Sequence, residues 1–306
     1  MIYDSKKFNI RYKAFFDFLK LNNEIRIWIA KPMDNSYQKI NKFLVSPKPK
    51  FSYKDDQGNE ILYFEFKNLK KIDIQMNIIA ILSKIKIDLN KKHDLSFDKS
   101  LSRYIKSERF LEHTSAIKKL TLEITKNDKN NLEKINTIFN FIAKKFKYCY
   151  PVKNRGVKNL DLKRLKGDCG EYSGLFVTMC RILKIPTRNT TGFTIFPKQK
   201  NINEHGWASV YLKKHGWIDV DPQYASLEKN INIGAKKYFL RRSEYRIAFI
   251  NGFNISLKPS IPKGFLLDYW NKIGLPLEND SVQTLQPLIF SSKNKIRFKE
   301  NIEIIK

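Results

Sequence analysis

Cysteine is scarce in this chain of 306 residues, which has three: Cys149, Cys169 and Cys180. An odd number of scattered cysteines offers no disulfide framework. The sequence also lacks a Cys-x-x-Cys pair, which argues against a structural zinc site. We therefore expect no metal or other cofactor, and a reducing, cytoplasmic setting.

Long apolar runs are also missing. No stretch approaches the roughly 18 uncharged apolar residues that a membrane-spanning helix needs. The first residues carry charges throughout and have no compact apolar segment before a cleavage site, so they do not resemble a signal peptide. A hydrophobic fraction of 42% is nevertheless too high for a disordered chain. We expect a folded protein without a membrane span.

Acidic residues are outnumbered, with 30 Asp and Glu against 58 Lys and Arg, which gives a net charge of +28. Basic surfaces attract nucleic acids and anionic membranes. Here the lysines run from end to end among abundant Asn and Ile, and all three residues have AT-rich codons. No stripe or arm concentrates the charge. We expect no specific nucleic-acid partner, and keep a nucleic-acid or anionic-surface binder as an alternative.

The first third of the chain has the pattern of β structure. Ile25, Ile27 and Ile29 alternate with other residues at a period of two. Residues 55–59 form a turn cluster between two strand-like segments, which predicts a hairpin. A long Ile-rich run follows at 72–90. Several strands without intervening helices suggest a small sandwich.

Helical periodicity appears further along. Asn130 and Glu133 resemble a capping box, and the apolar spacing behind them predicts a helix over 131–146. A second helical pattern starts at Cys169 and ends before Pro186. The period then returns to two in segments 188–196, 205–212 and 216–221, and residues 213–216 join the last two as a hairpin turn.

Cys169 is the candidate nucleophile. It follows a glycine-bearing turn and begins a helix, where backbone N–H groups and the helix dipole favour a thiolate. The same N–H groups can donate to an oxyanion. The flanking Asp168 and Glu171 are interpreted as caps of the helix start. Cys180 and Cys149 are interpreted as structural cysteines.

A thiolate nucleophile needs an imidazole base and an acid that orients it. His205 begins the strand 205–212. With a turn centred near 213–215, position 205 lies across from about position 222, which brings Asp221 beside His205. Asp219 would lie nearer positions 208–210 and is the reserve candidate.

These segments resemble the transglutaminase-like superfamily in GDCGEYSGLFVTMCRILKIPTR, EHGWASVYL and HGWIDVDPQ. Twelve positions fall in the family's order and close to its spacing: Gly167, Cys169, Tyr172, Ile185, Pro186, Arg188, His205, Trp207, Gly216, Trp217, Asp221 and Pro222. Two positions depart from the pattern: Lys184 stands where the family often has Gly, and Gly206 replaces the common Ala.

The resemblance implies an α+β fold, with a papain-like transglutaminase core preceded by a β-sandwich-like N-terminal domain. We predict a β-rich domain over 1–110, the catalytic core over 111–250, and a C-terminal extension over 251–306, for which packing on the core is one option. Substrate contacts are assigned to Trp207 and Tyr172, with core packing as the alternative interpretation of Trp207. Tyr148 and Tyr150 are candidates for a further oxyanion donor.

By the same resemblance, Cys169 attacks an amide or ester carbonyl, His205 handles the proton and Asp221 positions His205. The expected activity is hydrolysis of peptide or amide bonds through a thioester, with a protein or peptide as substrate. The alternatives are a glutamine–lysine transglutaminase, a deamidase, or a non-catalytic binding module with a basic surface.

Overall fold

The computed structural model describes residues 2–22, 24–91, 93–152, 154–196, 203–261, 280–285, 287–291 and 296–305. It mixes α and β structure, with sheets predominating and a β-rich N-terminal region, which confirms the predicted fold class. Two compact units alternate along the chain. The first comprises residues 1–3, 84–190 and 206–243, and the second comprises 4–83, 191–205 and 244–306.

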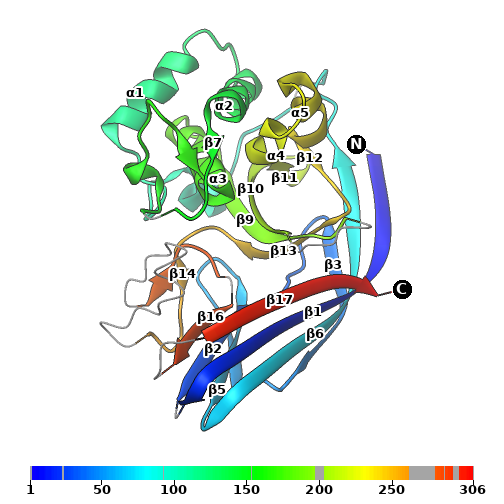
Figure 1. Ribbon diagram of the computed structural model, residues 1–306. Coiled ribbons are helices and arrows are strands. Elements are labelled where there is room, and N and C mark those ends of the chain that lie inside the picture. The colour runs from blue at the N-terminus through cyan, green and yellow to red at the C-terminus, as the bar shows by residue number, and fades with distance from the viewer. Residues whose placement is uncertain are drawn as a thin grey trace. The chain divides into compact units, whose positions relative to one another are not determined.

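The second unit is built from two main antiparallel sheets (Figure 1). Their strands are β1 (Ile2–Asn22), β3 (Gln38–Ser46), β6 (Leu69–Lys86) and β17 (Ile296–Ile305) in one, and β2 (Ile25–Ala30), β4 (Phe51–Lys54), β5 (Glu60–Phe66) and β16 (Leu288–Ser291) in the other. The first has the order β6-β1-β17, with β3 also paired to β6, and the second has the order β16-β2-β5-β4. Buried side chains from both sheets form one hydrophobic core, as a sandwich requires.

The period-two patterns explain these strands. Along β6, Ile74, Met76 and Ile78 are buried while their neighbours are more exposed. The predicted hairpin is confirmed by β4 and β5, which pair from Phe51↔Tyr63 to Lys54↔Glu60. Asp55 closes its turn, because Oδ1 accepts a hydrogen bond from the Asn59 N–H at 2.8 Å.

Strands near the end of the chain complete the N-terminal sheets. Strand β17 pairs with β1 from Asn9↔Ile305 to Phe18↔Ile296, and β16 pairs with β2. Within the predicted extension over 251–306, residues 262–279, 286, 292–295 and 306 lie outside the described part of the chain. The predicted boundaries near residues 110 and 250 stay a prediction.

The first unit holds the helices. They are α1 (Ser115–Ile124), α2 (Asn131–Lys145), α3 (Cys169–Ile182), α4 (Pro222–Ser226) and α5 (Ile231–Tyr238), with 3-10 turns η1 (Lys99–Ile105) and η2 (Val157–Asn159). The predicted helix after Asn130 is confirmed, since Asn130 Oδ1 accepts a hydrogen bond from the Glu133 N–H at 3.0 Å. Among the described residues, no helix combines the length and apolar character needed to cross a membrane.

Helix α3 is the central helix of this unit. Helices α1, α2 and α4 and both 3-10 turns pack against it, and most of its side chains are buried. Short strands β7 (Lys147–Tyr148) and β8 (Lys166–Gly167) pair just before it. This packing fixes the start of α3, where Cys169 lies.

The predicted hairpin after α3 is also confirmed. Strands β10 (Asn203–Leu212) and β11 (Gly216–Val220) pair from Ala208↔Val220 to Leu212↔Gly216. Strand β9 (Thr187–Thr194) begins in the first unit and ends in the second, where β13 (Arg246–Asn251) lies beside it. The short β12 (Arg241–Arg242) pairs with Ile85 and Lys86.

Candidate active site at the start of helix α3

Cys169 is the first residue of α3. The preceding Asp168 has an extended backbone and caps the helix, and its Oδ1 accepts a hydrogen bond from the Gly170 N–H at 2.8 Å. This confirms the predicted cap. The Cys169 side chain is partly exposed. A thiol at a helix N-terminus with access to solvent is in a setting that favours a reactive thiolate.

The other two cysteines differ from Cys169 in position. Cys180 is buried in the third turn of α3, and burial raises the pKa of its thiol. Cys149 is half-buried and follows β7, where its N–H donates to the Gly167 carbonyl at 2.9 Å. Neither begins a helix, so neither has the electrostatic advantage of Cys169.

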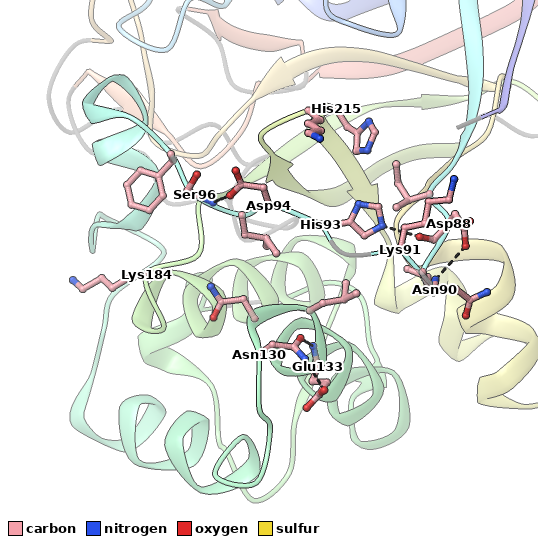
Figure 2. Close-up of a pocket in the computed structure, with 17 residues that line it drawn as sticks. Asp88, Asn90, Lys91, His93, Asp94, Ser96, Asn130, Glu133, Lys184 and His215 are labelled. Carbon is pink, nitrogen blue, oxygen red and sulfur yellow. Dashed lines mark hydrogen bonds between the residues drawn. The ribbon is translucent and has the colours of Figure 1, made fainter.

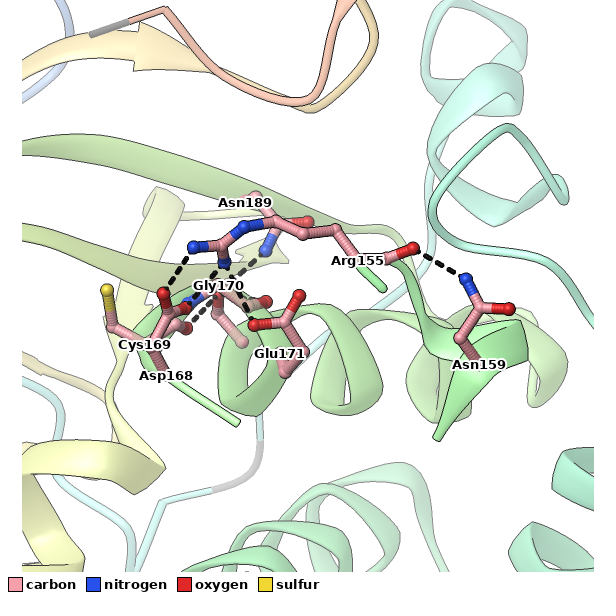
Figure 3. Close-up of polar contacts among 8 residues, drawn as sticks. Arg155, Asn159, Asp168, Cys169, Gly170, Glu171 and Asn189 are labelled. Atoms are coloured by element: carbon pink, nitrogen blue, oxygen red, sulfur yellow. Dashed lines mark hydrogen bonds and ion pairs between the residues drawn. The ribbon is translucent and has the colours of Figure 1, made fainter. Parts of the chain in front are cut away.

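A buried ion-pair cluster adjoins the start of α3 (Figure 3). Arg155 donates from Nη1 and Nη2 to the two carboxylate oxygens of Asp168, at 2.9 and 2.6 Å. Nη1 also donates to Glu171 Oε2 at 3.0 Å, and Glu171 is fully enclosed. Sequence reasoning missed Arg155, because it lies in an irregular loop and its partners come 13 and 16 residues later.

The groups of this cluster shift one another's pKa values. Burial raises the pKa of Glu171 to about 7, and the Asp168 carboxylate adds to the rise while Arg155 opposes it. Burial alone would also raise the pKa of Asp168, but the hydrogen bonds and charge of Arg155 hold it below its usual value. Near neutral pH, Arg155 is thus positively charged, Asp168 is ionised, and Glu171 is the carboxyl group that gains or loses a proton.

Strand β10 passes close to the nucleophile. A methyl group added at Gly206 would lie 3.7 Å from Cys169 Sγ and 3.9 Å from the Cys169 carbonyl oxygen, which is ordinary contact distance. His205 is the preceding residue of the same strand and is 3% exposed. The pairing of His205 with Cys169 stays a prediction.

The hairpin register distinguishes the two aspartates. Ser209 pairs with Asp219, as the count from the turn predicts. The ladder ends at Ala208↔Val220, and Asp221 follows β11 as the residue before α4, so its contact with His205 stays a prediction. Asp221 is buried and caps α4, because its Oδ1 accepts a hydrogen bond from the Tyr224 N–H at 2.9 Å.

The two predicted substrate contacts are buried. Trp207 has no exposed surface, and Tyr172 is 1% exposed. The Tyr172 hydroxyl donates to the Phe146 carbonyl at 2.7 Å, and its ring packs on the Phe146 ring at 4.2 Å between centroids. This environment favours a packing role for Tyr172, and substrate contact by either residue stays a prediction.

Tyr148 is one of the two candidate oxyanion donors. It is 55% exposed, and it pairs with Gly167 in the parallel β7–β8 ladder, two residues before Cys169. Burial of part of the ring, together with the nearby charges of Cys169 and Asp168, raises the pKa of Tyr148 to about 12. Its hydroxyl therefore remains a hydrogen-bond donor near the thiol throughout the neutral range.

A hollow in the first unit lies away from these residues. It has a volume of about 1530 Å³ and is lined by residues 87–91 and 93–97, the start of α2, and the turn bearing Lys214 and His215 (Figure 2). His93 and His215 meet there with ring centroids 5.6 Å apart. None of the predicted site residues lines it. Within the described ranges, no group of three or more His, Cys, Asp or Glu side chains could hold a metal ion.

Comparisons with known proteins give one family match within the chain. The family described as the transglutaminase-like superfamily matches residues 118–222, which include Cys169, His205 and Asp221. An uncharacterized protein of Haemophilus influenzae is 21% identical over 234 residues, which are 65% of this chain and 63% of the relative. The chain thus spans less than two thirds of that relative's length.

A solved structure shares the fold. A crystal structure of a candidate cysteine protease from Cytophaga hutchinsonii has a TM-score of 0.67 and 14% identity, covering 100% of this chain and 94% of that one. Red sea bream transglutaminase is similar at a TM-score of 0.37 and 10% identity, covering 92% of this chain and 72% of that one. At this identity the first similarity describes the fold alone, and the second is too weak to carry an argument.

Proposed function

We propose, on the premise that residues 118–222 match the transglutaminase-like superfamily, that the protein is a cysteine-dependent acyl-transfer enzyme that hydrolyses peptide or amide bonds. The observation that carries the proposal is the position of Cys169. It is a partly exposed thiol at the first residue of a buried, capped helix. That setting stabilises a thiolate and provides backbone N–H donors beside it.

In the proposed reaction, His205 takes the proton of the Cys169 thiol, and the sulfur attacks the carbonyl carbon of the substrate. The C=O electron pair moves onto oxygen, where N–H groups at the start of α3 and the Tyr148 hydroxyl can donate hydrogen bonds. As the C–N bond breaks, the imidazolium of His205 protonates the leaving amine. A thioester to Cys169 remains.

The second half of the reaction releases the acyl group. A water molecule gives a proton to His205 while its oxygen attacks the thioester carbon, and the C–S bond breaks to return Cys169 and a carboxylic acid. Asp221 holds the imidazole in the tautomer that both steps need. A primary amine in place of water would make the same enzyme a transglutaminase, and a glutamine side chain attacked by water would make it a deamidase.

The first experiment is alkylation of the purified protein with iodoacetamide between about pH 5 and about pH 9, read by peptide mass spectrometry. We expect Cys169 to react faster than Cys149 and Cys180 below about pH 7, and the His205→Ala variant to lose that advantage. If Cys169 reacts no faster than Cys149, the activated-nucleophile proposal fails and a binding module becomes the better interpretation.

A substrate screen separates the three outcomes. Peptide libraries report hydrolysis, release of ammonia from glutamine peptides reports deamidation, and incorporation of a fluorescent primary amine reports transglutamination. The Cys169→Ala variant is the control for each assay. Our proposal is cleavage of a protein or peptide substrate in a reducing, cytoplasmic setting, and amine incorporation faster than cleavage would contradict it.

A further inference from the structure

The Arg155 cluster lies directly behind the candidate nucleophile, but the reaction proposed above does not use it. Arg155, Asp168 and Glu171 are all buried. Burying a guanidinium and two carboxyl groups is costly unless they pair, and replacing such groups with apolar side chains is often neutral or stabilising. Stability alone therefore gives a weak reason for placing three ionisable groups at this helix start.

The electrostatic problem at this point of the chain is specific. Asp168 is the residue before Cys169, and its carboxylate is needed in position to cap α3. A carboxylate so close to a thiol disfavours the thiolate by like-charge repulsion. The cap thus supports the helix but works against the nucleophile that the helix presents.

Arg155 offsets this repulsion. Its paired hydrogen bonds to Asp168 are the fork geometry that binds a carboxylate most firmly. Burial alone would lower the pKa of Arg155, but the hydrogen bonds and charges of Asp168, Glu171 and Cys169 raise it, so the guanidinium stays charged. Cys169 directly follows the aspartate that Arg155 holds, so the two lie within electrostatic reach of each other (Figure 3).

Resting on the proposed function, we propose that Arg155 is a positioning residue for the nucleophile: it clamps the Asp168 cap and neutralises it, so that the Cys169 thiolate forms beside a cluster without net charge. Glu171 fits this arrangement because it is buried beside Asp168 and its raised pKa lets it carry a proton. In Figure 3 the Cys169 sulfur points away from Glu171, so the influence on Cys169 is electrostatic and does not depend on contact.

Other ionisable groups lie near Cys169 and the cluster. Tyr148, on β7, is within electrostatic reach of both Cys169 and Arg155 and is neutral below its raised pKa. Lys158, on η2, is mostly exposed and pairs with Glu112 at 3.6 Å. Solvent screens that pair more strongly than it screens the buried cluster. The proposed base His205 and its partner Asp221 are the same in every variant of the test below, so the variants change only the Arg155–Asp168 charge balance.

The test is the pH dependence of Cys169 alkylation in four proteins: wild type, Arg155→Gln, Arg155→Lys and the double variant Arg155→Gln/Asp168→Asn. Arg155→Gln leaves the cap carboxylate unopposed, so the apparent pKa of Cys169 should rise by about one pH unit. The double variant removes both charges and keeps a good helix cap, since Asn caps as well as Asp. Its curve should return to within about 0.3 pH units of wild type.

If Arg155 had a purely structural role, the double variant would react as slowly as Arg155→Gln or more slowly, because a second substitution in a damaged cluster would not restore the reactivity of Cys169. If the double variant reacts as slowly as Arg155→Gln, the inference is wrong. If Arg155→Gln does not fold, Arg155→Lys is the deciding variant, because lysine keeps the positive charge but cannot make the paired hydrogen bonds of a guanidinium. A Cys169 alkylation curve displaced by one pH unit or more in Arg155→Lys would also overturn the inference.

A matched control lies at the other end of α3. Arg181 pairs with Glu108 at 2.6 Å, and Glu108→Gln removes one carboxylate from that ion pair. This variant should lose stability without moving the Cys169 curve. The wild-type protein tests the proposed function separately. If its Cys169 is alkylated no faster than Cys149, the proposed function is refuted. If its Cys169 is alkylated faster but Arg155→Gln has the same pH dependence, only the inference about Arg155 is refuted.

Discussion

The carboxylate of Asp219 lies 3.0 Å from the guanidinium of Arg242, and both side chains are buried. The second Asp219 oxygen accepts a hydrogen bond from Ser209 at 3.1 Å. These partners occupy both oxygens of Asp219. Asp221, two residues later, caps a short helix instead. Of the two aspartates, one is therefore held in an ion pair and the other caps a helix.

The two aspartates should respond differently to the same substitution. Asp219→Asn leaves a buried arginine without its ion pair, and we expect a loss of about 3 kcal/mol in the free energy of unfolding. Asp221→Asn keeps the helix cap, so it should cost less than about 1 kcal/mol. It removes the charge that we propose orients His205, and should lower the rate of Cys169 acylation by at least about 100-fold.

Urea unfolding and single-turnover acylation measure the two effects on the same preparations. Equal losses of acylation rate in both variants, after allowing for the unfolded fraction, would reject Asp221 as the orienting acid.

Gly206 limits how large a residue can lie against the nucleophile. Gly206→Ala places a methyl group at ordinary contact distance, 3.7 Å from Cys169 Sγ, so the alkylation rate of Cys169 should change by no more than about twofold. Gly206→Val adds two methyl groups in the same direction and should displace the thiol, with a loss of at least about tenfold in the alkylation rate. The rate for Cys149 in each variant is the internal reference.

Gly167 has much less room. A methyl group there would lie 2.5 Å from Glu171 Cβ, and the Phe146 ring is 3.3 Å away. We expect Gly167→Ala to destabilise the protein by about 1–3 kcal/mol, because either α3 or β8 must shift. Gly206→Ala is its matched control on the other side of Cys169. A thermal unfolding curve for Gly167→Ala that overlies that of Gly206→Ala would show that the backbone relaxes freely at this point.

The parts of the molecule that could be predicted from the sequence are those with local signals. Asn130 and Glu133 mark the start of α2, and the turn at 213–216 fixes which residues of β10 and β11 face each other. The position of Cys169 at the start of α3 follows from the same kind of signal, a capping residue ahead of helical periodicity. Such patterns depend on neighbours within a few residues.

Long-range partners gave no such signal. The pairing of β1 with β17 joins the two ends of the chain, and nothing in either segment specifies the register. Arg155 is likewise one of many basic residues in a basic chain until the fold brings it to Asp168. The burial of Tyr172 against Phe146 also depends on how α3 packs, which periodicity alone does not determine.

Glu171 should make stability depend on pH in a recognisable direction. Its pKa in the folded protein is about 7, above the ordinary value of 4.5, so the folded state holds a proton that the unfolded chain releases. Stability from this group is therefore fully present below about pH 4.5 and is lost as the pH rises towards 7 and above. The glutamine of Glu171→Gln cannot titrate, so the stability of this variant should not fall with rising pH through this group.

The difference between the two proteins isolates this group from the others that titrate in the same range. Relative to wild type, Glu171→Gln should gain on the order of 2 kcal/mol in the free energy of unfolding between about pH 5 and about pH 8. Glu300, whose pKa burial also raises to about 7, is present in both proteins and cancels in the comparison. Urea unfolding at the two pH values measures the gain. A constant difference would mean that Glu171 is ionised throughout, in which case the cluster beside Cys169 carries a net negative charge at neutral pH and Arg155 offsets only half of the acidic charge that surrounds it.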